Sequence, residues 1–467
     1  MAAPKIAIVS TPKGKSIQQS ENFLAAKHNQ LSCLESVEDL VLDETKLSEG
    51  DRQAIEHHIL NIRAATARAL WSKEIYVGPS LLDEFVFSTA KQGGPGVAAR
   101  VLTNLATAGA ETPGFVLYPL TSFGMKMSGR FQPDPALKDY IVFRAAGFAA
   151  STQVNSVKAG YERLAEMARA LGVRGKIDRW DIEHFAHSAT WIRSNPLLLV
   201  RLTSHTGDMY ENQFVYKLKI RSAASALLML HALSLESHGS IDKFRSTLHV
   251  NNFQTLDIRH YLIGEGLPNG KISTRRVPMN VSPLDLVRLS DVAATISSEA
   301  MATSRMKRFE TQIVAALKTV ERGYFQHVNL TSKSKAQARF YKRLVTALDW
   351  FRQSFGSHAN ESEAVVALAV AFETLLTDSY QPGVADRMIR RVGICLKGFP
   401  RIAQYKQSVR DVYYARGSIV HTGELGQTAN VANAQAAFTR CFCSIASRIA
   451  SWTPTANDPM RNLLGDT

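Results

Sequence analysis

Two residues near the C-terminus, Arg416 and His421, carry side chains that suit chemistry on RNA phosphates. They lie in the segment YYARGSIVHTGE, residues 413–424. A histidine can move a proton to or from a ribose 2′-hydroxyl or a leaving oxygen near neutral pH. An arginine fork can hold a phosphate and stabilise the extra negative charge of the transition state. The pair therefore indicates phosphoryl transfer from RNA as a candidate activity.

The spacing of the pair raises a geometric problem. On a continuous helix, residues five apart lie about 140° apart, so the two side chains would face different ways. Gly417 and the glycine of the following HTG predict that the helix ends near Gly417, which would let both side chains turn to one surface. A purely structural interpretation stays open, in which Arg416 caps helix carbonyls and His421 fills a turn.

The elements that must position these residues have helical periodicity. Amphipathic patterns with short connections predict a bundle of helices. They cover residues 336–355, 361–379, 384–398, 401–416 and 432–452. The helix over 361–379 is apolar nearly all round, which indicates a central position, and it encloses Glu373 among apolar neighbours.

The first 280 residues have a different, mixed texture. A helix is predicted to open near Ser48, and further helices are expected within 157–173 and 221–235. Short apolar runs in 114–125 and 197–205 are typical of strands. The turn-rich segment 264–283 is the best boundary, and the segment 282–301 after it is expected to be a helix. We therefore predict an α+β region, 1–280, and an all-α C-terminal region, 281–467.

Composition narrows the class of protein. The 467 residues are 45% hydrophobic and carry a formal net charge of +14. Residues 301–467 contribute +10 of this charge, from 22 basic and 12 acidic residues. A basic surface attracts polyanions, which favours a nucleic-acid partner without naming one. No apolar run is long enough for a membrane span, the start does not resemble a signal peptide, and four cysteines make no disulfide framework. A cytoplasmic location is expected.

Metal and nucleotide motifs are weak. His184 and His187, next to Glu183, have a spacing that can hold a metal ion on a helix, which leaves a metal hydrolase as a minor alternative. Cys441 and Cys443 would point about 200° apart on a helix and cannot share an ion. The Gly-Lys-Ser near the N-terminus lacks the first glycine of a phosphate-binding loop. We expect no metal and no cofactor.

The C-terminal segments, in their order, resemble a known family. A helix ending in DWF, a central AFETLL helix, a connecting helix, and then Tyr-x-x-Arg-x-x-x-x-His-x-Gly are similar to the HEPN domain, specifically its Apea-like branch. The resemblance covers about residues 338–452, a quarter of the chain. It implies a helical bundle that dimerises, and a metal-independent endoribonuclease that leaves a 2′,3′-cyclic phosphate.

The resemblance also implies roles for individual residues. Arg416 would contact the phosphate and His421 would act as acid or base, in a site composed from two protomers. The position after the arginine is usually polar in active members, and here it is Gly417, so Ser418 would have to supply the hydroxyl. Tyr413 and Tyr414 can stack on an RNA base, although packing in the bundle explains them equally well. Arg410 completes the expected substrate-binding set.

Proteins of this kind often act as toxins or in anti-phage defence. The expectation is therefore a cytoplasmic endoribonuclease whose region 1–280 senses a phage or antitoxin trigger and restrains the nuclease. The main alternative is a non-catalytic HEPN scaffold or nucleic-acid-binding module.

Overall fold

The computed structural model places most of the chain, apart from a set of terminal and loop segments. It describes residues 9–40, 47–73, 75–108, 114–128, 136–137, 140–143, 154–173, 175–180, 182, 184, 196–202, 214–238, 260–266, 270–278, 292–329, 334–356, 361–379, 382–423, 429–449, 452 and 458–466.

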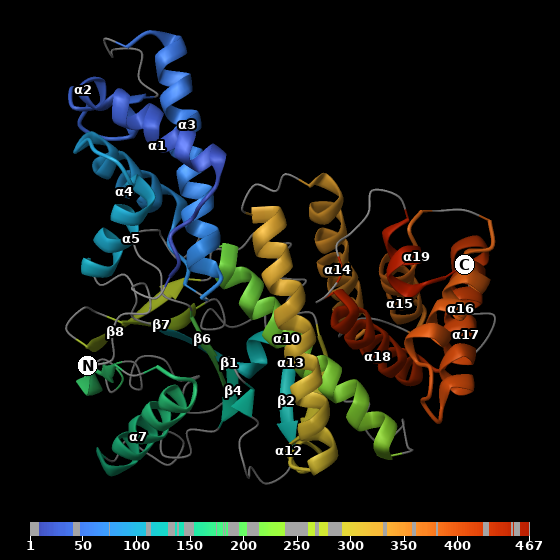
Figure 1. Cartoon of the computed structure of the whole chain (residues 1–467). Coiled ribbons are helices and arrows are strands. Elements are labelled where there is room, and N and C mark those ends of the chain that lie inside the picture. Colours follow the sequence, from blue (N-terminus) through green and yellow to red (C-terminus); the bar gives the residue numbers. More distant parts are fainter. Residues whose placement is uncertain are drawn as a thin grey trace.

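Helices dominate the described chain (Figure 1). The N-terminal group comprises α1 (Lys15–Ala26), α2 (His28–Leu31), η2 (Glu38–Leu40), α3 (Glu49–Trp71), α4 (Pro79–Lys91) and α5 (Val97–Thr107). The middle of the chain contributes α7 (Val154–Ala170) and α10 (Phe214–His238). The C-terminal part contributes α12 (Ser298–Met301), α13 (Ser304–Tyr324), the π-helical turn η7 (Phe325–Asn329), α14 (Lys335–Gln353), α15 (Glu361–Leu376), α16 (Val384–Cys395), α17 (Ile402–Thr422), α18 (Val431–Ile449) and α19 (Pro459–Leu464).

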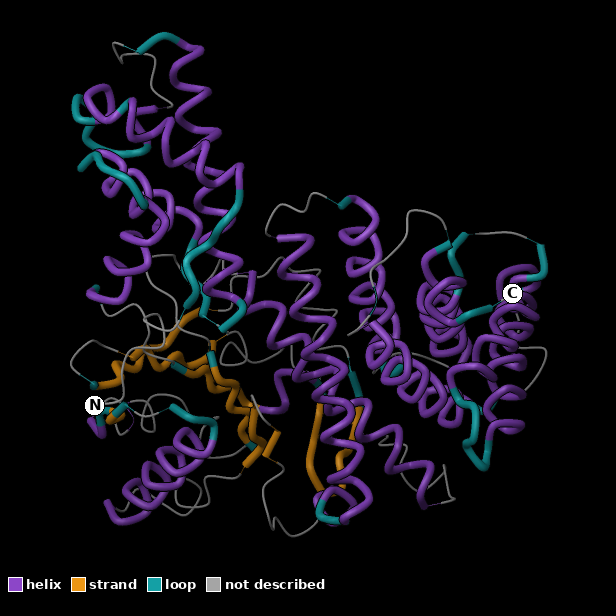
Figure 2. The backbone as a smooth tube through the Cα atoms, viewed as in Figure 1, coloured by secondary structure: helices purple, strands orange, loops and turns teal. Residues whose placement is uncertain are grey.

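A curled sheet from the middle of the chain lies beneath the N-terminal helices in the view of Figure 2. Its described strands, in the order β3-β4-β6-β1-β7-β8-β5, are antiparallel except for the β5–β8 pair. A separate parallel pair joins β2 and β9. The strand bounds are β1 (Phe115–Pro119), β2 (Met125–Ser128), β3 (Ala136–Leu137), β4 (Tyr140–Phe143), β5 (Lys176–Ile177), β6 (Leu197–Arg201), β7 (His260–Gly266), β8 (Lys271–Pro278) and β9 (Ala294–Ser297), with the 3-10 turn η3 (Leu120–Phe123) between β1 and β2.

Both faces of the central strands are buried, which explains why β1 and β6 are almost continuously apolar. Alternate residues enter two cores because side chains alternate along a strand. Phe115, Leu117, Leu197 and Leu199 pack on the α7 side. Val116, Tyr118, Leu198 and Val200 pack on the α10 side, in the core that continues into the C-terminal helices.

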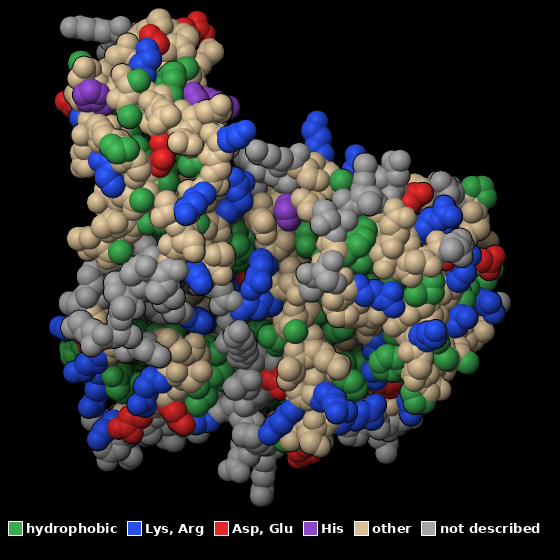
Figure 3. Space-filling view, in the orientation of Figure 1, with side chains coloured by type: hydrophobic (Ala, Val, Ile, Leu, Met, Phe, Trp, Pro, Cys, Tyr) green, Lys and Arg blue, Asp and Glu red, His purple; other side chains and the backbone are tan. Residues whose placement is uncertain are grey.

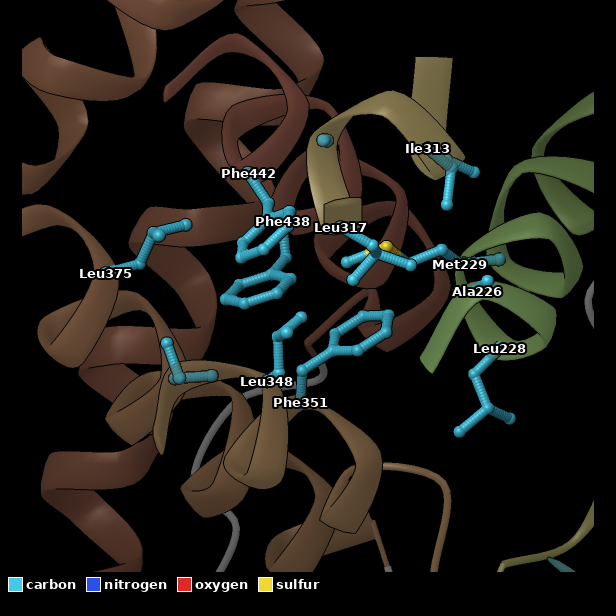
Figure 4. Packing of buried hydrophobic residues seen from close by; sticks show 14 of the residues in the cluster. Ala226, Leu228, Met229, Ile313, Leu317, Leu348, Phe351, Leu375, Phe438 and Phe442 are labelled. Carbon is cyan, nitrogen blue, oxygen red and sulfur yellow. The ribbon is translucent and has the colours of Figure 1, made fainter. Parts of the chain in front are cut away.

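That continuous core joins α10 to the C-terminal bundle. Figure 4 shows Ala226 and Met229 of α10 lying near Leu317, with the rings of Phe351 and Phe438 beyond them. The two rings, from α14 and α18, stack with centroids 4.6 Å apart. The hydrophobic core thus runs across residue 280, and the expected division of the chain there remains a prediction.

A buried ion pair reinforces the same junction. Glu236, near the end of α10, has a side chain only 1% exposed, and its carboxylate accepts a hydrogen bond of 2.7 Å from Arg440 of α18. Arg305 and Arg401 lie 3.8 and 4.0 Å from the same carboxylate. Arg401 is also the N-cap of α17, immediately before its first residue, Ile402. Glu236 therefore ties α10 to α13, α17 and α18.

The N-terminal helices have a core of their own and meet the rest through aromatic rings. Ile55, Ile59 and Ile62 of α3 are fully buried in that separate core. Trp71 at the end of α3 lies 4.1 Å from Phe325 between ring centroids, and Tyr76 packs against the same ring. Phe325 belongs to η7, so the π-helical turn is where the N-terminal group docks.

One sequence expectation about the region around residue 280 is wrong, and the boundary expected at 264–283 stays a prediction. That turn-rich segment overlaps β7 and includes β8, because residues on either side of Gly270 pair as antiparallel strands. The helix expected over 282–301 is overturned at Ala294–Ser297, which form strand β9 against β2. Residues 279–291 lie outside the described part. The alternating burial along β9 suits a strand, and the β-branched Thr295 and Ile296 favour it.

Several helices and strands expected in the first 280 residues are confirmed. Ser48 caps α3 by accepting the N–H of Asp51, α7 and α10 cover 157–173 and 221–235 in large part, and β1 and β6 occupy the apolar runs. From α12 onward the described chain is helical, so the mixed region followed by a helical one is confirmed. Among the residues described, no helix is both long and apolar enough to cross a membrane.

Candidate active site on helix α17

Helix α17 carries both Arg416 and His421 without interruption, so the helix break expected at Gly417 is wrong. The helix ends instead at Gly423, whose φ of 75° is left-handed and whose N–H bonds the Ile419 carbonyl at 2.9 Å. A glycine inside a helix costs only about 1 kcal/mol relative to alanine. Burial of Val412 and Ala415 on the inner face of α17 offsets such a cost, so the helix continues.

Arg416 turns toward α15, at the edge of the bundle core. Its side chain is 32% exposed, and its Nη1 lies 3.6 Å from Oε1 of Glu373, which is 21% exposed. The contact is an ion pair without a hydrogen bond, since neither Glu373 Oε1 nor Arg416 Nε has a hydrogen-bond partner. Such partly exposed pairs stabilise a protein by about 1 kcal/mol or less.

The structural interpretation of Arg416 as a cap of helix carbonyls does not describe its contacts. That part is taken by Arg343 of α14, whose Nε donates to the Thr374 carbonyl at 2.6 Å near the end of α15. Arg416 contacts a side chain instead. The sequence pointed to Glu373 only as an acidic residue among apolar neighbours, and its pairing with Arg416 is a feature that the spacing of the motif could not show.

His421 lies exposed in the last turn of α17. It follows Arg416 by five positions on a continuous helix, so within one chain the two side chains leave the helix about 140° apart. The chain by itself does not bring the pair to one surface.

The other expected site residues divide between two faces of α17. Arg410 and Tyr414 are exposed, Tyr414 by 53%, and lie within about 40° of His421 around the helix. Tyr413 is partly buried against the core, with its ring 6.1 Å from that of Tyr414. Ser418 is half-buried and its carbonyl accepts a hydrogen bond from the Thr422 hydroxyl. Arg410, Tyr414 and His421 therefore form one exposed stripe, which we call the outer face of α17.

Gly417 lies on this outer face, between Tyr414 and His421. A Cβ atom added there would meet no neighbouring atom within 4 Å, and its φ is not left-handed. Nothing in the described part of the chain requires a glycine at this position. A helix without a Cβ at one point allows another backbone to come close there.

The surroundings of α17 are basic. Figure 3 shows several groups of Lys and Arg side chains on the visible surface of the C-terminal helices, with fewer acidic ones between them. This matches the excess of 22 basic over 12 acidic residues in 301–467. Such a surface raises the encounter rate with a polyanion but does not define a binding site.

The described residues offer no arrangement that supports the minor alternative of a metal site. His184 is exposed, whereas His187 and Glu183 lie outside the described residues. Within the described part, no three histidine, cysteine, aspartate or glutamate residues are grouped to hold a metal ion. Cys441 is buried and Cys443 half-buried on α18, and burial raises the pKa of both thiols, as expected for packed side chains.

No protein-family model, no curated protein and no solved structure matches this chain.

Proposed function

We propose that this protein is a metal-independent endoribonuclease whose active site forms between two copies of the chain. Arg416 of one copy would bind the scissile phosphate, and His421 of the other would move the proton of the 2′-hydroxyl or of the leaving oxygen. The observation that carries the proposal is the division of the motif across α17, with Arg416 against α15 and His421 on the exposed outer face.

The outer face of α17 has the properties that such an assembly needs. Tyr414 is a large side chain that is 53% exposed on this face. Gly417 lies between Tyr414 and His421 and would permit a close crossing of two α17 helices. In a two-fold dimer the same patch meets itself, so each dimer would hold two sites of equal composition.

Catalysis would require Arg416 to exchange partners. Its guanidinium lies at 3.6 Å from Glu373 without a hydrogen bond, so a phosphate that offers two oxygens can replace that contact with a bidentate one. Tyr414 on the outer face is the residue best exposed to stack on a base of the RNA.

A mixing experiment tests the composite site. Arg416→Ala and His421→Ala variants are each expected to lose cleavage of labelled single-stranded RNA in EDTA. In a heterodimer of the two variants, one site loses both residues and the other keeps both. Random exchange makes half of the dimers mixed, so an equal mixture should regain about a quarter of the wild-type activity. A mixture as inactive as its components, or a wild-type chain that stays monomeric at high concentration, contradicts the composite site.

The controls separate activity from folding and from a missing trigger. The free energy of unfolding of Arg416→Ala should lie within about 1 kcal/mol of that of wild type, because the pair with Glu373 is partly exposed. Lys397→Ala removes an exposed positive charge outside α17 and should leave cleavage unchanged. Overexpression in cells provides a second test, since toxicity relieved by His421→Ala reports a nuclease that lacks its trigger in vitro.

The region before residue 280 would regulate this nuclease, as a toxin or anti-phage defence effector requires. The contact that supports this part of the proposal is Glu236 of α10, which lies 4.0 Å from Arg401 at the start of α17. A shift of α10 would therefore act on the helix that carries both motif residues.

The contact between Arg416 and Glu373 also fits a second, non-catalytic function. If Glu373 serves to neutralise Arg416 permanently, the protein is a nucleic-acid-binding or scaffold module that uses the exposed Arg410 and Tyr414. RNA would then bind, with no cleavage under any trigger, and binding would weaken in Tyr414→Ala but remain unchanged in Arg416→Ala.

A further inference from the structure

A polar hollow of about 190 Å³ lies apart from the outer face of α17, between the end of α15, α16 and α19. Four arginines line it. They are Arg387, Arg390 and Arg391 of α16 and Arg461 of α19. Sequence analysis did not predict this site, because its residues come from segments separated by about 70 positions.

Two buried aspartates form the floor of the hollow. The Asp378 carboxylate accepts the N–H groups of Met460 and Arg461, at 2.6 and 3.1 Å, and Nη1 of Arg391 at 3.1 Å. Asp466 accepts Nε of Arg391 at 2.7 Å and Nη2 of Arg390 at 3.0 Å. The hydrogen bonds from Arg390, with those from Arg391, hold the pKa of Asp466 at about 2, so this carboxylate is ionised at neutral pH. These contacts fasten the C-terminal segment to α16.

The mouth of the hollow keeps a positive excess. Arg391 is buried and paired with both aspartates of the floor. The Arg390 side chain is 54% exposed, and Arg461 is exposed as well. A guanidinium has five N–H donors. The contacts above use two of those of Arg390, and the Asp466 carbonyl takes the Nε–H of Arg461 at 3.0 Å. Four arginines face three aspartates, so the lining has a net charge of +1.

Asp458 is the third aspartate and lies at the exposed edge. Its φ of 43° is left-handed, a conformation that no other described non-glycine residue adopts. Strained backbone of this kind persists where surrounding contacts hold it, and it is frequent at ligand sites. Its carboxylate repels an incoming anion, so removal of this charge should strengthen anion binding.

We propose that this hollow binds the phosphate group of a small phosphorylated metabolite through Arg390, Arg461 and Arg387. Guanidinium forks match phosphate oxygens in geometry and charge. The volume exceeds that of a cavity of about 150 Å³ that accepts benzene, so a phosphate with part of its carrier fits. A small ligand is favoured over RNA because a polymer is held by several phosphates along a charged surface, whereas this excess of one charge is confined to one hollow. The inference does not depend on the nuclease proposal.

The test measures binding of inorganic phosphate, pyrophosphate and AMP to the full-length protein by calorimetry, at constant ionic strength set with sodium chloride. At least one probe should bind at a single site. Arg461→Gln and Arg387→Gln should each weaken that binding about tenfold, as expected for a lost charged hydrogen bond. Asp458→Asn should tighten it, and Lys397→Gln, outside the hollow, should not change it.

Three outcomes would overturn the proposal. One is that no probe binds at millimolar concentration. Another is binding that both arginine variants leave unchanged while their urea midpoints equal that of wild type. The third is that single-stranded RNA alone binds and loses affinity in these variants, which would make the hollow part of a polymer-binding surface. Cleavage assays on the same variants keep this result separate from the proposed activity.

Discussion

Replacing Gly417 with alanine should have opposite effects on the single chain and on the dimer. In the single chain the new methyl group meets no atom within 4 Å, and the backbone at residue 417 is helical without a left-handed φ. Alanine favours a helix interior over glycine by about 1 kcal/mol. The variant should therefore raise the free energy of unfolding by about 0.5–1 kcal/mol.

In the proposed dimer the same methyl group would stand at the closest approach of two helices. An added carbon in a tight contact costs about 1–3 kcal/mol, and every 1.4 kcal/mol is a factor of ten in the dissociation constant. Dimerisation should weaken by about tenfold or more, and RNA cleavage should fall in parallel at concentrations near the dissociation constant.

The measurements are urea unfolding by circular dichroism at low protein concentration, and sedimentation velocity over a concentration series. Gly50→Ala is the control, since Gly50 is also helical and without a neighbour within 4 Å of an added Cβ, but lies in the first turn of α3. A destabilised Gly417→Ala monomer would show that the outer face is covered within the chain. A stabilised variant with wild-type dimerisation and cleavage would refute the crossing at Gly417.

Three further perturbations test the packing and electrostatics. Gly323→Ala should destabilise the protein by about 3 kcal/mol, because its Cβ would lie 1.9 Å from the buried ring of Tyr341; an unchanged urea midpoint would show that α13 and α14 part easily. Glu236→Gln should cost about 3–5 kcal/mol, since it leaves the buried Arg440 uncompensated, and restoration of the midpoint by a second change, Arg440→Met, would identify charge as the cause. Burial raises the pKa of Glu310 from 4.5 to about 7, so the folded state favours the protonated form and stability falls as pH rises from about 4 through 7. Because Glu310 is partly exposed and solvent screens its charge, Glu310→Gln should gain about 1–2 kcal/mol over wild type at pH 8 and nothing at pH 4; a gain that is equal at both pH values would trace the effect to packing.

Much of the helical architecture follows from local patterns. The stripe of Phe340, Leu344, Leu348 and Phe351 predicts α14, and the same residues are buried there. Ser48 as a cap for α3 needs only its own side chain and the N–H of a residue three positions later. Such signals are local, so one segment suffices to express them.

The sheet shows where local patterns fail. The turn residues around Gly270 favour a boundary when the segment is taken alone, whereas the structure pairs the strands on either side of them, β7 and β8, in one sheet. Ala294–Ser297 became a strand because β2, about 170 residues earlier, offers a parallel edge. A strand is stabilised by its partner, and the partner is not visible in the segment itself.

The candidate site divides in the same way. Residue types alone nominated Arg416 and His421, and helical phase alone predicted that one continuous helix would separate them. Only the tertiary structure decided that the helix is continuous, that Arg416 faces Glu373, and that four arginines gather beside α19. The reason is physical: side-chain chemistry and helical phase are properties of a short segment, whereas burial, charge pairing and the filling of a hollow depend on residues far apart in the chain.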